Sequence, residues 1–304
     1  MSNRKKISFV WQGVTERWHH WNDGLRLAMR YVGEVHDVSY KEPWDELTGD
    51  VILYWEAPCT INGSNAPHFI KVRDTPKPKA LLFAGGPVTA ENTEGFDLFF
   101  LESEINEGEF TKLRKNWIRA FGVNDEIFRP IPGIQKTFDG CMQATFAGWK
   151  RQPLFAEALG KNGILCGRYQ EHEPYPFTAS SQSVQLPEMP YEAVNVILNA
   201  SHCAVNTSEF WGGGQRCTLE AMAAGIPAVV MSDSPKNREY VEESGAGIVC
   251  EPNPQSIREA VEAIKGWTKE EKERGIAYVQ AKYSGRIYAD NLLKGISCLV
   301  SQTK

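Results

Sequence analysis

The stretch that decides the fold is Gly212-Gly213-Gly214-Gln215-Arg216-Cys217-Thr218-Leu219-Glu220-Ala221-Met222-Ala223-Ala224-Gly225-Ile226-Pro227-Ala228. Three glycines lead into a predicted helix, 218–224, which Gly225 and Pro227 separate from an apolar strand. Backbone N–H groups and the positive end of the helix dipole converge at the glycines, an arrangement that binds anions such as a diphosphate. Glu220 is expected in the first turn of this helix, where its carboxylate can accept two hydrogen bonds from a diol such as ribose. The stretch therefore predicts a site for a nucleoside diphosphate.

The regions on both sides of this stretch alternate short apolar runs with helical patterns, which predicts parallel βαβ units. The expected strands are 7–11, 35–38, 51–55, 80–83, 98–101, 142–147, 164–166, 203–206, 228–231 and 247–250. The expected helices are 21–31 (ending at Gly33), 154–159, 191–198, 218–224, 237–244, 256–264 and 285–300. The predicted fold class is α/β, with two Rossmann-like, doubly wound parallel sheets that face a cleft.

The Pro-rich segment 129–133 predicts a stiff linker between two domains. We expect one domain over 1–130 and a second over 131–284, followed by a last helix within 285–304.

The composition is that of a soluble enzyme: 304 residues, 42% hydrophobic and 23% charged, with a net charge of −5. This charge gives no global attraction to nucleic acid or to an acidic membrane. No apolar run approaches the roughly 20 residues that span a bilayer, and the apolar run at the start is too short for a signal peptide. The seven cysteines are widely spaced and include no CxxC pair, which predicts reduced thiols and a cytoplasmic location.

The chain resembles the GT-B glycosyltransferases, in particular glycosyltransferase family 4 (the group 1 glycosyl transferases). Besides the glycine run and Glu220, the segments that resemble the family in order and spacing are 121–130, 145–159, 186–200, 239–241 and 245–249. The resemblance covers about 121–265, and over residues 1–120 it is one of pattern only. It implies a transferase that takes a sugar from a nucleotide-diphosphate sugar. It also implies that 1–130 is an N-terminal, acceptor-side domain, that 131–284 is a C-terminal, nucleotide-sugar-binding domain, and that the helix 285–304 crosses back to the first domain.

The chain departs from the family at one position. The family has a first glutamate eight residues before the second, and here that position is Gly212, whereas the nearest upstream acid is Glu209. In the family this first glutamate contacts the donor sugar. We assign Glu209 as a candidate that turns inward to replace it, and the departure leaves the donor sugar open.

Lys150 and Arg151 follow Gly148 at a predicted strand end. Such a pair can clamp a diphosphate and neutralise the leaving group, and it is equally compatible with a solvated turn. The resemblance favours the clamp, because it implies a basic residue on this loop, but it does not decide which of the two side chains acts.

Other donor-site residues are assigned from the donor loop and from the resemblance. Gly212, Gly213 and Gly214 would offer N–H groups to the phosphates, and Gln215 and Arg216 follow them at the helix start. Arg216 is a second candidate cation for the phosphates or a partner of a surface acid. The resemblance implies that backbone groups around 182–187 read the nucleobase, and we assign Leu186 to this role.

In the first domain, His20 lies in the aromatic cluster Trp18-His19-His20-Trp21 and is a candidate acid or base. The alternative is a solvated histidine at a helix start. Gly13, after the first strand, would let the acceptor or the donor approach the backbone. We expect no metal site, because the sequence contains no Asp-x-Asp motif and no His or Cys spacing typical of metal ligands.

The function expected from the sequence is transfer of a hexose or pentose to a hydroxyl acceptor, retaining and metal-independent. The donor, with a UDP-sugar favoured and a GDP-sugar second, is a substrate, and no tightly bound cofactor is expected. Two alternatives remain, a nucleotide-sugar epimerase on the same fold and a non-catalytic nucleotide-binding module. A small molecule, a glycan or a modified nucleic-acid base is compatible as acceptor, and the oligomeric state is open.

Overall fold

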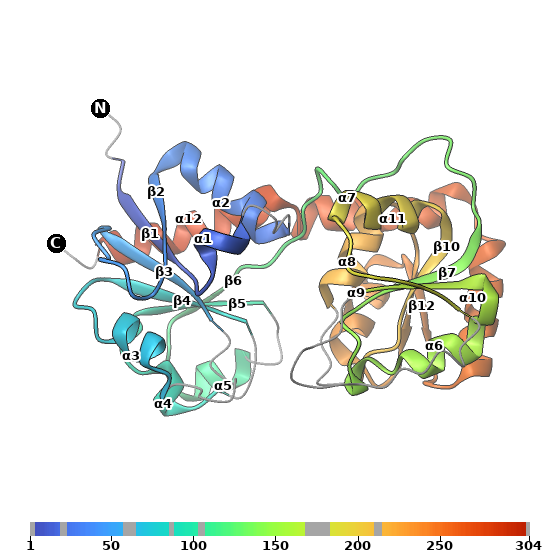
Figure 1. Ribbon diagram of the computed structural model, residues 1–304, viewed down its shortest axis with the longest axis horizontal. Coiled ribbons are helices and arrows are strands. Elements are labelled where there is room, and N and C mark those ends of the chain that lie inside the picture. The colour runs from blue at the N-terminus through green and yellow to red at the C-terminus, as the bar shows by residue number, and fades with distance from the viewer. Residues whose placement is uncertain are drawn as a thin grey trace. The chain divides into compact units, whose positions relative to one another are not determined.

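The chain forms two compact units in the computed structural model, which describes residues 4–18, 23–56, 65–84, 88–102, 107–167, 183–209 and 215–301 (Figure 1). Unit 1 comprises Met1–Phe121 and Gly285–Lys304, and unit 2 comprises Gly122–Ser284. Within the described ranges, no helix is both long and apolar enough to cross a membrane.

Unit 1 contains a parallel sheet with the strand order β2-β1-β3-β4-β5-β6. Its strands are β1 (Lys6–Val10), β2 (Asp37–Lys41), β3 (Val51–Glu56), β4 (Lys79–Phe83), β5 (Leu98–Leu101) and β6 (Trp117–Arg119). The strand order reverses between β1 and β3, where Val10 pairs with Tyr54. In doubly wound sheets, such a reversal opens a crevice for ligands at the carboxyl ends of the strands.

Helices cover both faces of this sheet: α1 (Val14–Arg17), α2 (Gly24–Val35), α3 (Pro67–Arg73), α4 (Ala90–Thr93), α5 (Glu107–Lys112) and α12 (Gly285–Ser301). Figure 1 shows α2 and α12 on one face and α3 to α5 on the other. Alternate residues of β3 enter the two cores, since Leu53 packs with α2 and α12 whereas Tyr54 packs with Phe69 of α3. Leu292 and Ile296 of α12 lie one helical turn apart in the first of these cores, so α12 completes unit 1.

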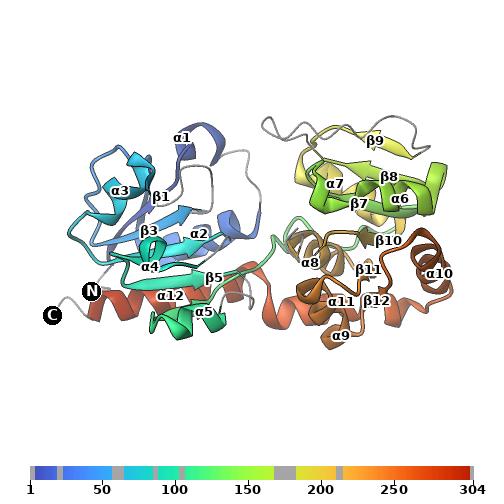
Figure 2. The same ribbon diagram turned by 90° about the horizontal axis from the view of Figure 1, so that it is seen from below.

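Unit 2 contains a second parallel sheet, with the order β12-β11-β10-β7-β8-β9 (Figure 2). Its strands are β7 (Phe138–Gln143), β8 (Gly163–Cys166), β9 (Val184–Leu186), β10 (Ser201–Asn206), β11 (Ala228–Met231) and β12 (Gly247–Cys250). The order reverses between β7 and β10, which is the arrangement of a Rossmann-type dinucleotide-binding sheet. The predicted pair of doubly wound parallel sheets is confirmed.

The helical elements of unit 2 are η4 (Gly148–Lys150), α6 (Gln152–Leu159), η5 (Gly160–Asn162), α7 (Tyr191–Asn199), α8 (Gln215–Ala223), α9 (Pro235–Ser244), α10 (Pro254–Lys265) and α11 (Lys269–Lys282). On one face, α6 and α10 bury Phe155 and Ile257 against Val205 and Val229 of the sheet. Figure 1 shows α7 and α11 on the other face. There α11 packs closely on α8, because Gly275 lies directly against Met222.

The boundary between the units lies before the Pro-rich linker. Residues 122–130, expected in the first domain, belong to unit 2. The side-chain amides of Asn195 and Asn199 on α7 both donate to the Arg129 carbonyl at 3.1 Å, and Ile131 N–H donates to Asn199 at 2.8 Å. These bonds fix the Pro-rich segment to unit 2, so it is a structured part of that unit.

Several expected elements are displaced in the structure. The strand expected at 142–147 lies at 138–143, and the helix expected to end at Gly33 continues to Val35. Helix α8 begins at Gln215, three residues before the expected start, so Glu220 lies in its second turn and not in its first. The sequence analysis missed the three-residue strands β6 and β9 and the helices α1, α3, α4, α5 and α11.

Candidate active site

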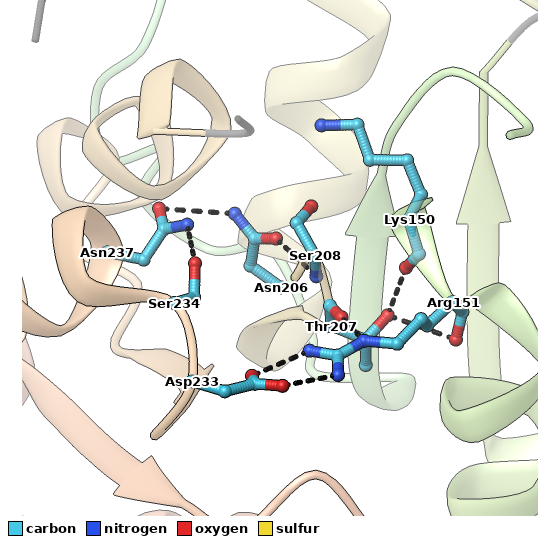
Figure 3. Close-up of polar contacts among 8 residues, drawn as sticks. All are labelled: Lys150, Arg151, Asn206, Thr207, Ser208, Asp233, Ser234 and Asn237. Carbon is cyan, nitrogen blue, oxygen red and sulfur yellow. Dashed lines mark hydrogen bonds and ion pairs between the residues drawn. The ribbon is translucent and has the colours of Figure 1, made fainter. Parts of the chain in front are cut away.

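The segments that follow β7 and β10 are joined at the carboxyl edge of the second sheet (Figure 3). The hydroxyl of Thr207 donates to the Lys150 carbonyl at 2.6 Å, and its own carbonyl accepts from Arg151 Nε at 2.7 Å. Glu209 N–H donates to the Trp149 carbonyl at 3.1 Å. Residues 148–151 and 206–209 are therefore held at the strand-order reversal, the position where sheets of this type bind ligands.

Lys150 ends η4 and is 9% exposed. Burial lowers the pKa of Lys150; of its titratable neighbours, Cys217 raises this pKa and Arg216 lowers it. Both neighbours lie in the first turn of α8, so the ammonium group is near the start of this helix. Figure 3 shows the Lys150 side chain extending away from Arg151. A buried cation beside a helix N-terminus is suited to an anionic ligand.

Arg151 is directed to a partner within the protein. Its Nη1 and Nη2 donate to the two carboxylate oxygens of Asp233 at 2.7 and 2.8 Å. The backbone of Arg151 is left-handed, with φ of 50°, a conformation that is uncommon for residues other than glycine. The guanidinium of Arg151 is held by Asp233 and by the Thr207 carbonyl. Of the two basic side chains, Lys150 is therefore the candidate for contact with an anionic ligand.

A buried polar network lies beneath the loops at this edge (Figure 3). The Asn237 side-chain oxygen accepts from Thr218 at 2.8 Å and from Asn206 at 3.3 Å, and its amide donates to Ser234 at 2.9 Å. Asn206 in turn accepts from Ser208 N–H at 3.1 Å. The network joins the end of β10 to the starts of α8 and α9. It was not found from the sequence, because its members lie up to 31 residues apart and match no motif.

Ser208 is a further residue that the sequence analysis did not identify. It is 1% exposed, and its hydroxyl has no hydrogen-bond partner among the described residues. Figure 3 shows this hydroxyl on the side of the network toward the Lys150 ammonium. Because a buried hydroxyl without a partner costs free energy, its position at a ligand-binding edge suggests a ligand contact.

Glu220 is completely buried, and its Oε2 accepts from Gln143 Nε2 at 2.8 Å. Gln143 is the last residue of β7, so the carboxylate lies at the same edge of the sheet. A surface role, such as compensation of the helix dipole, does not fit a side chain with no exposure. Burying an ionised carboxylate is costly, which favours a functional role.

The remaining donor-site residues are distributed around α8 and β9. Gln215 is the first residue of α8, Arg216 is half-buried beside it, and Glu209 is exposed. Leu186 ends β9 and is half-buried, and its carbonyl accepts from Gly167 N–H at 3.4 Å. Gly212, Gly213 and Gly214 lie outside the described residues.

The assigned residues of unit 1 are not brought together. His20 lies outside the described residues. Gly13 has a left-handed backbone with φ of 91°, and its N–H donates to the Glu42 carboxylate at 2.8 Å. That N–H is thus engaged within the protein. Among the described residues, no group of three or more His, Cys, Asp or Glu side chains is placed to hold a metal ion.

Part of unit 2 is similar to a known family. Residues 179–282, all within unit 2, match the model of the family Glycosyl transferases group 1. A search of curated protein sequences found no match. The chain has the GT-B fold, and the match over 179–282 confirms the resemblance predicted from the sequence.

Solved structures show the same fold over nearly the whole chain. A sucrose-phosphate synthase from Thermosynechococcus elongatus superposes with a TM-score of 0.72 at 12% identity, covering 98% of this chain and 100% of the other. A glycosyltransferase from Rickettsia africae gives 0.72 at 12% identity, with 98% and 99% covered. Anabaena HepE, solved in complex with UDP-glucose, gives 0.69 at 14% identity, with 97% and 100% covered.

Proposed function

We propose that this protein is a glycosyltransferase that transfers a hexose or pentose from a nucleotide-diphosphate sugar to a hydroxyl acceptor, with retention of anomeric configuration and without a metal ion. A UDP-sugar is the first candidate donor, since HepE, a protein of the same fold, was solved with UDP and with UDP-glucose. The observation that carries the proposal is the buried ammonium of Lys150 at the strand-order reversal of unit 2, near the start of α8.

In this proposal each residue at the edge has a defined task. Lys150 and the N-terminus of α8 hold the diphosphate and stabilise the charge that develops as the bond to the sugar breaks. Glu220 accepts the ribose hydroxyls, and the backbone at Leu186 lies against the base. The Ser208 hydroxyl and Glu209 are placed to contact the donor sugar, in the segment where the family's first glutamate is displaced.

The donor site is tested by thermal shift with UDP, GDP, ADP, CMP and their common sugars on wild type, Lys150→Met and Glu220→Gln. We expect UDP to stabilise the wild type, since a ligand of the folded state adds RT ln(1 + [L]/Kd). Loss of a charge-assisted hydrogen bond weakens binding by roughly 1.5–3 kcal/mol, so the Kd should rise about tenfold to a hundredfold in Lys150→Met.

Lys136→Met is the matched control. Lys136 precedes the opposite end of β7, where its ammonium donates to the Ser201 carbonyl at 2.7 Å. We expect its UDP affinity to equal that of the wild type. Equal UDP affinity in Lys150→Met and Lys136→Met would contradict the donor site. Hydrolysis of UDP-glucose without acceptor then separates a transferase, which shows slow turnover, from a binding module, which shows none.

A further inference from the structure

Four side chains meet at the carboxyl end of β3 in unit 1. The Glu56 Oε2 atom accepts from the Tyr54 hydroxyl at 3.0 Å and lies 3.1 Å from His68 Nε2. The ring of Trp44 lies against that of His68, with centroids 6.0 Å apart and planes at 81°. Glu56 ends β3, His68 lies in the first turn of α3, and Trp44 follows β2. We call these four residues the β3 cluster.

The β3 cluster occupies the position where this sheet is built to receive a ligand. The strand order of unit 1 reverses between β1 and β3, and Glu56 is the last residue of β3. In the turn after β1, the hydrogen-bond donors of Gly13 and Thr15 are already used within the protein. The Glu42 carboxylate accepts from Gly13 N–H, Thr15 N–H and the Thr15 hydroxyl at 2.8–3.0 Å. The β3 cluster, at the end of the other strand that borders the reversal, carries side chains suited to polar ligands.

The hydrogen bonds of the β3 cluster orient the ring of the histidine. Burial raises the pKa of Tyr54, as do the charge and the hydrogen bond of Glu56, so the phenol keeps its proton and donates it to the carboxylate. When neutral His68 donates its Nε2 proton to the same carboxylate, its Nδ1 carries a lone pair and acts as an acceptor. The His68 side chain is 18% exposed, whereas Glu56 is 13% exposed. His68 is thus an oriented side chain that is partly exposed to solvent.

Trp44 adds an apolar surface beside this acceptor. It is 53% exposed, the highest value among the exposed large hydrophobic side chains of the described residues. Its backbone carbonyl accepts from the Lys71 ammonium of α3, which fixes the segment that carries the ring. An exposed aromatic face next to a hydrogen-bond acceptor suits a ligand with both C–H faces and hydroxyl groups.

We propose that the β3 cluster is a saccharide-binding site, in which a sugar hydroxyl donates to His68 Nδ1 and the sugar ring lies against Trp44. This inference rests on the proposed function, because it makes the acceptor a carbohydrate. Glu56 and Tyr54 act as positioning residues that set the tautomer and orientation of His68. They do not touch the sugar.

The test measures binding of sugars in the absence of nucleotide. Methyl glycosides of glucose, galactose, mannose and N-acetylglucosamine, and the corresponding disaccharides, are titrated into the full chain and followed by saturation-transfer NMR. We expect at least one of them to bind the wild type, and its affinity to fall at least tenfold in both His68→Gln and Trp44→Ala. Trp44→Phe keeps an aromatic face and should retain most of the affinity. His36→Gln, which changes another histidine of unit 1, should bind as the wild type does.

Chemical shifts of the side chains separate a ligand contact from a structural role. On addition of the sugar, the ring signals of Trp44 and His68 should shift in the wild type, and the His68 signals should still shift in Trp44→Phe. The thermal shift that UDP causes is measured on each variant as well. A normal shift shows that unit 2 is folded, and it tests the donor site separately from the β3 cluster. If no glycoside of the panel binds, or if His68→Gln and Trp44→Ala bind as tightly as the wild type, the inference is overturned, whatever the result with UDP.

Discussion

Arg151 and Asp233 form a two-point ion pair, 2.7 and 2.8 Å, across 82 residues of sequence. Because Arg151 is bound to Asp233, Lys150 is the one of these two adjacent basic side chains that can contact a ligand in the candidate donor site. The same guanidinium donates to the Thr207 carbonyl, so the pair also holds the segment that precedes Ser208. We therefore assign Arg151 a positioning role and Lys150 the ligand contact.

The first prediction concerns the pH dependence of this pair. The hydrogen bonds from Arg151 hold the pKa of Asp233 below its usual range. A carboxyl group with a depressed folded-state pKa stabilises the fold above its unfolded pKa, about 3.9, and this contribution is lost as the pH falls through the folded pKa. Because Asp233 is 43% exposed, solvent screening limits the contribution to about 1 kcal/mol.

We expect Asp233→Asn to lower the free energy of unfolding at pH 7 by about that amount, and the gap from the wild type to close between about pH 4 and pH 2. Urea denaturation at pH 7, 5, 3 and 2.5 measures it. Glu242→Gln, which breaks the exposed pair with Arg238 at 3.3 Å, is the control and should change stability by less. A gap that persists unchanged at pH 2.5 would show that the ion pair is not its source.

The second prediction concerns the buried network at Asn237, which is 1% exposed. Asn237→Ala removes the acceptor of the Thr218 and Asn206 donors, and we expect a loss of roughly 1–3 kcal/mol in the free energy of unfolding. Because the network fixes the starts of α8 and α9, UDP affinity should fall as well. Denaturation and calorimetric titration with UDP measure the two effects.

Asn253→Ala separates stability from binding. Asn253 caps α10 by accepting from Ser256 N–H at 2.9 Å, and loss of such a cap costs about 1 kcal/mol. We expect this variant to be less stable but to bind UDP as the wild type does. Should both asparagine variants bind UDP with unchanged affinity, the network would be a stabilising element only.

The sequence predictions are accurate where an element is determined by residues close together in the sequence, and less accurate where it is determined by contacts with distant segments. Strands 98–101, 228–231 and 247–250 have the predicted bounds, because each is an apolar run with clear flanking residues. Strand β7 was placed four residues too late, because its core residues include Gly140 and follow the charged Asp139, whereas 142–147 is more apolar. Helix α11 was missed because the residues it buries are Gly275 and Val279, which give no amphipathic pattern.

The same reasoning applies to the site. Glu220 and the basic pair could be named as candidates from the sequence because the glycine run, the helix and the strand ends are local features. The choice between Lys150 and Arg151 depends on Asp233, and the roles of Ser208 and Asn237 depend on burial. Contacts between segments distant in sequence are set by the fold, and one sequence alone does not reveal them.

The last prediction uses the same substitution in two helices. In α11, a Cβ at Gly275 would lie 2.7 Å from the Met222 Cβ and 2.9 Å from its Cα, so α11 and α8 would have to move apart. In α2, a Cβ at Gly33 would have no atom within 4 Å. We expect Gly275→Ala to destabilise unit 2 by roughly 1–3 kcal/mol, as overpacking does. Gly33→Ala should stabilise unit 1 by roughly 0.5–1 kcal/mol, because alanine loses less backbone entropy in a helix.

Urea denaturation, followed by probes in each unit, gives both values, and each variant is the control for the other because the chemical change is identical. Opposite signs would show that the space at the glycine decides the effect. If Gly275→Ala were as stable as the wild type, the close packing of α11 on α8 would be contradicted. If Gly33→Ala were less stable than the wild type, the open surroundings of Gly33 would be contradicted, and the continuation of α2 to Val35 would need another explanation.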